Sequence, residues 1–157
     1  MDFELNEDQI AYRDAAKAFA EKAMAPHAAD WDIDHTFPVD VIREAGQLGF
    51  CGIYTPEAQG GMGLSRLDTS VIVEELAVAC PSTAAYITIH NMATWMVAKF
   101  GNETVQNDIA PRMASGEWLA SYCLTEPGAG SDAANLQTKA VRDGDVYRLT
   151  GSKVFIS

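Results

Sequence analysis

The chain has 157 residues, 48% hydrophobic and 21% charged, so it is long enough for one domain with a sizeable core and is unlike a disordered or collagenous chain. Eleven lysines and arginines against 22 aspartates and glutamates give a formal net charge of −11, which would repel nucleic-acid phosphates and anionic lipid surfaces. No apolar run approaches the roughly 18 residues that span a bilayer. We therefore expect neither nucleic-acid binding nor membrane insertion.

The N-terminal segment 1–8 has neither the basic region of a signal peptide nor the arginines of a transit peptide. We expect a cytoplasmic bacterial protein, or a mitochondrial matrix protein that has lost its targeting segment. The three cysteines, Cys51, Cys80 and Cys123, are odd in number and form no C-x-x-C pair. This pattern predicts buried free thiols in a reducing compartment, without a disulfide framework or a zinc site.

The first part of the chain carries helix signals. Asn6 and Gln9 match a capping box, and apolar residues follow at helical spacing, which predicts a helix of about 18 residues that ends before Pro26. A polar stretch at 30–36 follows, and Pro38 then begins a second helix. The apolar stripe of this second helix consists of Val39, Ile42, Ala45 and Leu48.

The glycine-rich segment 56–64 interrupts the helical pattern. It contains Gly60, Gly61 and Gly63, but it has neither the Lys-Ser or Lys-Thr pair of a phosphate-binding loop nor the order G-x-G-x-x-G. We therefore expect a tightly turned loop in preference to a nucleotide loop.

Three further helices are predicted after this loop. Ser65 opens one that ends at Pro81. Residues 82–100 carry few charges and spread apolar side chains around the whole circumference, as in a helix buried on most sides. Asn102 caps the last helix, which Pro111 is expected to bend or shorten.

The residue pattern then changes to that of strands. Residues 118–125 favour a strand, 137–142 and 146–150 flank an Asp-Gly-Asp turn like a hairpin, and 153–157 begin another strand. These short strands are too few to close a barrel or to cover a sheet face.

The fold class predicted from these elements is α+β. An N-terminal all-α helical domain, residues 1–116, precedes the beginning of a mostly antiparallel β domain, residues 117–157, which is incomplete.

The segment 122–132 reads Tyr-Cys-Leu-Thr-Glu-Pro-Gly-Ala-Gly-Ser-Asp and resembles the signature of the flavin-dependent acyl-CoA dehydrogenases. Residues 123–132 meet each element of that pattern, whereas Asn135 stands where the family usually has Gly, Ser or Ala. The resemblance extends over essentially the whole chain, including the glycine-rich loop and the segment 151–157.

The resemblance implies an enzyme that holds FAD and oxidises the α,β bond of an acyl-CoA. It also implies a homotetramer that passes electrons to an electron-transfer flavoprotein, with a C-terminal helical bundle beyond the β domain. Segments 63–70, 82–86 and 89–92 are most similar to the branched-chain members that act on isobutyryl-CoA in valine degradation. Two alternatives stay open, a dehydrogenase for another short-chain acyl-CoA and a non-catalytic helical module that binds acyl-CoA or a protein.

The resemblance also implies which residues contact FAD. These are Tyr122, Leu124, Thr125, Gly130, Ser131, Phe155, Ile156 and Ser157, and Ser131 is expected to touch the acyl-CoA substrate as well. The residue types suit the task, because glycine allows close approach to a pyrophosphate and the Leu124 and Thr125 amides, with the Thr125 hydroxyl, can stabilise negative charge on a reduced flavin. Phe155 supplies a flat apolar wall where many relatives have Trp. A plain Pro-Gly turn and an ordinary strand are the structural alternatives.

Thr88 and Ile89 correspond to the family element that lines the acyl pocket, although filling of the helical core is the alternative for each. His90, alone on an apolar helix, is expected to be a hydrogen-bonded core residue, and no metal site is predicted. No catalytic residue is assigned. The family's carboxylate base belongs to the C-terminal helical domain, which no segment here matches, and Glu126 belongs to the flavin loop.

Overall fold

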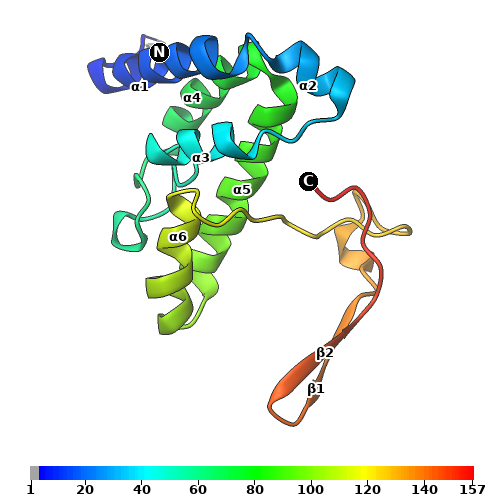
Figure 1. The fold of residues 1–157 in the computed structure, drawn as a ribbon. Coiled ribbons are helices and arrows are strands. Elements are labelled where there is room, and N and C mark those ends of the chain that lie inside the picture. Colours follow the sequence, from blue (N-terminus) through cyan, green and yellow to red (C-terminus); the bar gives the residue numbers. More distant parts are fainter. Residues whose placement is uncertain (1–3) are drawn as a thin grey trace. The chain divides into compact units, whose positions relative to one another are not determined.

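The computed structural model describes residues 4–157 and divides into two compact units, one ending at Ala120 and the other comprising Ser121–Ser157 (Figure 1). The first unit is helical, and the second contains one antiparallel hairpin. The predicted α+β class is therefore confirmed. Among the described residues, no helix is both long and apolar enough to cross a bilayer.

Helix α1, Glu7–Phe19, begins at the predicted capping box. The Gln9 backbone N–H donates to Asn6 Oδ1 at 2.8 Å, and the Asn6 N–H donates to Gln9 Oε1 at 3.1 Å. The π-helical turn η1, Ala20–Met24, continues the helix, so the predicted length is confirmed. A residue placed three positions after the cap is a local signal, which is why the sequence reveals this boundary.

Helix α2, Ala28–Asp34, lies where no element was predicted. None of its residues is fully buried, and only Ala28 and Trp31 pack against the core. The remaining positions are largely acidic, so no apolar periodicity marks the helix. Its formation reflects tertiary packing of one aromatic side chain, which a pattern search does not detect.

Helix α3, Val39–Gln47, follows Pro38 as predicted, with Ile42 and Ala45 buried. Leu48 lies at its C-cap and is 48% exposed, so it does not complete the predicted stripe. The loop that follows contains the 3₁₀ turn η2, Glu57–Gln59, and is tightly turned as expected. A Cβ at Gly61 would overlap the Thr55 carbonyl oxygen, so the backbone approaches closely there and glycine is required.

Helix α4, Arg66–Ala79, packs against both α1 and α5, Pro81–Phe100 (Figure 1). A second capping box starts α4, where the Asp68 N–H donates to Ser65 Oγ at 3.2 Å. Gly101 ends α5 as predicted. Among the fully or almost fully buried side chains of this core are Ala16, Phe19, Met24, Ile53, Ile72, Leu76 and Ile87.

The last helical stretch consists of the π-helical turn η3, Val105–Ile109, and α6, Ala110–Ala114. Asn102 caps it, because its Oδ1 accepts the Val105 N–H at 3.0 Å. Pro111 has no N–H to donate, and α6 ends soon after it, so the predicted shortening is confirmed. The π-helical widening of η3 before it was not predicted.

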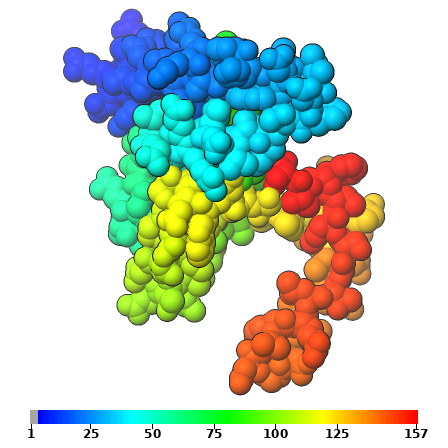
Figure 2. All heavy atoms as spheres, in the orientation of Figure 1, coloured from blue at the N-terminus to red at the C-terminus, as the bar shows by residue number. Residues whose placement is uncertain are grey.

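The second unit contains the predicted hairpin. Strand β1, Lys139–Asp143, pairs antiparallel with β2, Val146–Thr150, and Gly144 takes a left-handed φ of 63° in the turn. Every residue of the two strands is exposed, and the atoms of the hairpin are the orange spheres in Figure 2. A short 3₁₀ turn, Ala133–Asn135, precedes them.

The strands predicted at 118–125 and 153–157 are wrong, since neither segment is part of a ladder in the described chain. A strand needs a partner for its backbone groups, and β1 and β2 pair only with each other. Phe155 also has a left-handed φ of 55°, which interrupts an extended backbone.

Candidate functional site

The signature segment folds into a tight turn inside the second unit. The Glu126 N–H donates to the Ala129 carbonyl at 3.0 Å, and the Ala129 N–H donates to the Glu126 carbonyl at 3.1 Å. These reciprocal bonds close the backbone around Pro127 and Gly128. The local geometry is thus that of a Pro-Gly turn, so any binding role depends on which donors the turn leaves free.

Thr125 keeps its donors free. Within residues 4–157 neither its N–H nor its hydroxyl has a hydrogen-bond partner, while its carbonyl accepts the Val154 N–H at 3.0 Å. The Leu124 N–H, by contrast, donates to the Tyr122 carbonyl at 3.1 Å. Of the two amides expected to serve as donors, only that of Thr125 is available.

Glu126 is the charged centre of this loop. Its side chain is 5% exposed, and it accepts the Gln137 N–H at 2.6 Å, the Thr138 N–H at 2.9 Å and the Lys153 ammonium at 2.9 Å. Hydrogen bonds from Thr138, Gln137 and Lys153 lower the pKa of Glu126 to about 2. A general base needs a pKa near the working pH, so Glu126 is suited to holding the loop together and not to removing a proton.

We expect the second unit to lose stability on acidification as Glu126 is protonated. Because the folded state lowers the pKa of this carboxyl from 4.5 to about 2, the folded state binds fewer protons than the unfolded state. The stabilisation is therefore fully present above pH 4.5 and disappears as the pH falls to about 2. Hydrogen exchange of the Gln137 and Thr138 backbone N–H groups, which donate to Glu126, measures this loss of stability. The variant Glu126→Gln should lack this pH dependence, and equal dependence in both proteins would contradict the assignment.

Five of the remaining predicted flavin contacts are exposed, and Tyr122 is half-buried. Gly130, Ser131 and Ser157 are exposed, Phe155 is 94% exposed, and Ile156 is 38% exposed. All eight predicted residues lie in the second unit, in the segments 122–131 and 155–157. The Val154–Thr125 bond and the Lys153–Glu126 pair join these segments, so the structure brings together residues about 30 positions apart in the chain.

The residues singled out on α5 have different environments. Thr88 and Ile89 are half-buried, and the Thr88 hydroxyl donates to the Ala85 carbonyl at 2.7 Å. Neither is among the buried core residues. His90 is fully buried, with Nε2 at 2.8 Å from the Met113 carbonyl and Nδ1 accepting the Ala120 N–H at 3.1 Å. These bonds fit a neutral ring, and burial lowers the His90 pKa, so its expected structural role is confirmed.

The cysteines agree with expectation at two of three positions. Cys51 and Cys80 are buried free thiols, and burial raises the pKa of Cys51 to about 12. Cys123 is exposed, so its expected burial is wrong. It lies in the segment 118–125, which is not part of a ladder in the described chain. No group of three or more His, Cys, Asp or Glu residues in the described chain could hold a metal ion.

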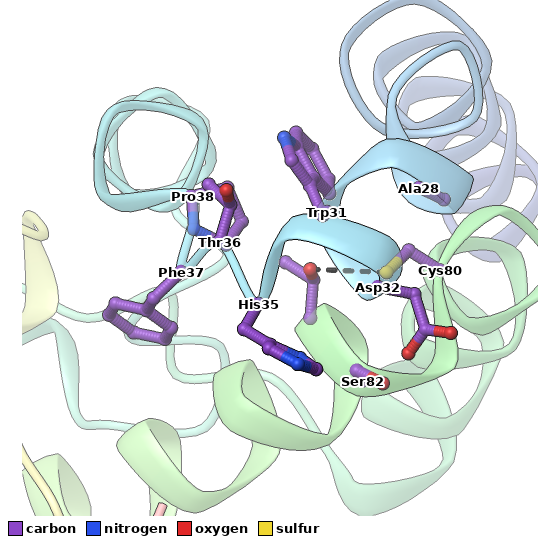
Figure 3. A pocket seen from close by; sticks show the side chains of 10 residues that line it. Ala28, Trp31, Asp32, His35, Thr36, Phe37, Pro38, Cys80 and Ser82 are labelled. Carbon is purple, nitrogen blue, oxygen red and sulfur yellow. Dashed lines mark hydrogen bonds between the residues drawn. The ribbon is translucent and has the colours of Figure 1, made fainter.

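A pocket of about 170 Å³ lies in the helical unit, between α2, the loop after it and the start of α5 (Figure 3). Trp31 and Asp32 come from α2, and Cys80 and Ser82 from the opposite wall. The dashed line in Figure 3 is the contact between Cys80 Sγ and the Thr83 hydroxyl, at 3.2 Å. This pocket contains none of the predicted site residues and no nucleophile hydrogen-bonded to a base, so we place the candidate site at the signature loop.

Comparison with known proteins supplies independent evidence. Residues 6–117 match the family model described as acyl-CoA dehydrogenase, N-terminal domain. The chain is 54% identical over 153 residues to mitochondrial isobutyryl-CoA dehydrogenase of Bos taurus and 53% identical over 153 residues to that of Dictyostelium discoideum. Each alignment covers 98% of this chain and 37% of the relative, so the chain spans little more than a third of the length of these proteins.

Solved structures of related proteins have the same fold as this chain. A glutaryl-coenzyme A dehydrogenase in complex with glutaryl-CoA matches with a TM-score of 0.93 at 30% identity, over 99% of this chain and 40% of that chain. The structure described as PigA with FAD and proline matches with a TM-score of 0.91 at 26% identity, over 99% of this chain and 42% of that chain.

Proposed function

The chain belongs to the acyl-CoA dehydrogenase family, and from this we propose that it is the N-terminal part of an FAD-dependent enzyme that oxidises the α,β bond of a short branched-chain acyl-CoA. The 54% identity over nearly the whole chain to an isobutyryl-CoA dehydrogenase is the observation that carries the proposal, and it favours isobutyryl-CoA as substrate. The predicted domain division, residues 1–116 and 117–157, belongs to the same proposal, as does a role in valine degradation.

The residues of the signature loop fit a flavin. A flavin presents acceptor nitrogens and oxygens along one edge and a flat apolar ring. The Thr125 N–H and hydroxyl are donors without a partner in the described chain, and the exposed Phe155 ring offers an apolar surface. Gly130 leaves open space, since no described residue beyond its two chain neighbours has a heavy atom within 4 Å of the position of a Cβ there. When bound, FAD would supply the acceptor for the hydride that leaves the β carbon.

The residues of this chain would bind and orient the flavin and the acyl-CoA. The donors of Thr125 would stabilise negative charge near the flavin pyrimidine ring. The N–H belongs to backbone that the Val154 bond holds, and the hydroxyl can rotate toward an acceptor. Gly130 would allow the backbone to approach a pyrophosphate, and Tyr122, Leu124, Ile156 and Ser157 would complete the contacts. The Ser131 hydroxyl, which can donate and accept at once, would also contact the acyl-CoA. Thr88 and Ile89, half-buried on α5, are proposed to line the acyl pocket.

The base that removes the α proton is proposed to come from another part of the full-length protein. Glu126 is unsuited to that role, because Gln137, Thr138 and Lys153 occupy its carboxylate and lower its pKa, and His90 is held in the core by bonds on both ring nitrogens. Assembly into a homotetramer and electron transfer to an electron-transfer flavoprotein are proposed with the function.

Purification of the full-length protein tests the proposal. We expect bound FAD and turnover of isobutyryl-CoA with an artificial electron acceptor, faster than with butyryl-CoA or 2-methylbutyryl-CoA. The 157-residue chain alone is expected to give no turnover, because the base and part of the flavin site are missing. A full-length protein without flavin, or turnover by the 157-residue chain, would contradict the proposal. Preference for a different acyl-CoA would leave the proposed enzyme class unchanged but would contradict isobutyryl-CoA as the substrate.

A further inference from the structure

Two segments of the second unit are held together by contacts that involve Glu126 and Lys153. The Lys153 ammonium donates to the Leu124 carbonyl at 2.8 Å and to Glu126 Oε1 at 2.9 Å. Next to it, the Val154 N–H donates to the Thr125 carbonyl at 3.0 Å. Three consecutive residues of the signature loop are thus fixed by two consecutive residues near the C-terminal end of the chain.

Glu126 extends this arrangement to a third segment. Its Oε2 accepts the Gln137 N–H and its Oε1 accepts the Thr138 N–H, immediately before β1. The Lys153 side chain is 23% exposed and that of Glu126 is 5% exposed, so solvent screens this pair less than a surface ion pair. Removal of one partner would leave a mostly buried charge without its counter-ion.

The positions of these contacts connect the two halves of the candidate site. Thr125, with its free N–H and hydroxyl, stands between the two residues that Lys153 binds. The segment 155–157 follows directly after Val154. Because the unit has only one two-stranded ladder, which lies outside these segments, sheet pairing does not fix their separation. The Lys153–Glu126 pair, the Lys153–Leu124 bond and the Val154–Thr125 bond do so instead.

We propose that Glu126 and Lys153 are positioning residues whose ion pair sets the Thr125 donors against the segment 155–157, and thereby the affinity and reduction potential of the bound flavin. This inference rests on the proposed function. Variants that remove either charge are therefore expected to affect the flavin, although neither side chain is required to touch the cofactor.

The test uses full-length protein with the variants Lys153→Met, Glu126→Gln and Lys153→Arg. Apoprotein is titrated with FAD, and the reduction potential of the bound flavin is measured against a reference dye. We expect Lys153→Met and Glu126→Gln to weaken FAD binding by about tenfold or more, the size of effect that loss of one charge-assisted hydrogen bond gives. The potential should become more negative, because displaced donors stabilise the reduced flavin less. Lys153→Arg should restore part of both.

Two further variants separate positioning from general stabilisation. Arg148→Met removes an exposed ion pair with Asp143 in the hairpin of the same unit, and it should change neither FAD affinity nor potential. Thr125→Val removes the hydroxyl donor directly. Because Lys153 acts through Thr125, the double variant Lys153→Met with Thr125→Val should lose less affinity than the sum of the single losses.

The outcomes are distinguishable. If the wild-type protein takes up no FAD, the proposed function fails and the inference fails with it. If wild-type protein binds FAD while Glu126→Gln and Lys153→Met lower the melting temperature but leave the affinity and potential of the bound flavin unchanged, only the inference is overturned. Should Lys153→Met fail to fold, the near-isosteric Glu126→Gln decides the question by the same two measurements.

Discussion

Replacement of Asn91 by leucine is expected to lower the free energy of unfolding of the helical unit by about 3 kcal/mol or more. The variant leaves two buried backbone groups unpaired, the Phe50 carbonyl and the Ile53 N–H, whereas the Ile87 carbonyl remains an acceptor within the helix. Asn91 is 1% exposed, and its amide donates to the Phe50 carbonyl at 2.7 Å and to the Ile87 carbonyl at 2.9 Å. Its Oδ1 accepts the Ile53 N–H at 2.7 Å. Leucine has the same branched arrangement of side-chain heavy atoms and is not smaller than asparagine, so the loss does not come from a cavity. Urea denaturation followed by circular dichroism measures it.

Thr94→Val is the matched control for this prediction. Thr94 is fully buried on the same helix, and its hydroxyl donates at 2.8 Å to the His90 carbonyl. That carbonyl is also an acceptor within the helix ladder, so valine leaves no buried acceptor unpaired, and a change of about 1 kcal/mol or less is expected. If Asn91→Leu costs no more than Thr94→Val, the loop from Phe50 to Ile53 does not depend on Asn91.

The role of Asn91 shows why only part of this fold follows from the sequence. The capping pairs at Asn6 and Ser65 join residues three positions apart, so their partners are visible in the chain itself. Asn91 instead binds residues 38 and 41 positions away, and no pattern of spacing identifies a loop as the partner of one helix residue. Helix α2 was missed for a related reason, since Trp31 packs on the core from an otherwise acidic segment.

In the candidate site, too, local features were predicted from the sequence and contacts between distant residues were not. The residue types of the signature loop are sufficient to predict a flavin segment by resemblance, and the hairpin turn is evident from Asp-Gly-Asp. The Glu126–Lys153 pair was not predicted, because its partners are 27 positions apart. The one available signal was chemical, a glutamate among small and apolar residues that would need a counter-charge if buried. The strands at 118–125 and 153–157 failed because residue preference cannot supply a missing ladder partner.

The glycine at position 130 should be required for the cofactor and not for the fold. In this structure Gly130 is exposed, its φ is outside the left-handed region, and no described residue beyond its two chain neighbours has a heavy atom within 4 Å of the position of a Cβ. Valine there therefore meets neither a steric clash nor backbone strain within the chain, and a surface substitution of this kind changes stability by about 0.5 kcal/mol or less. If the backbone approaches a pyrophosphate at this point, the same side chain occupies the space of the ligand.

We accordingly expect Gly130→Val in the full-length protein to be folded but to contain little flavin, with Gly130→Ala intermediate because its side chain is smaller. Ala134→Val, also exposed and in the same unit, adds comparable bulk four residues away and should retain flavin. The ratio of flavin to protein absorbance gives the occupancy, and circular dichroism shows that each variant is folded. A plain Pro-Gly turn predicts normal flavin content in all three variants. Full occupancy in Gly130→Val would thus remove Gly130 from the cofactor site, whereas selective loss would show that open space at this turn is reserved for the ligand.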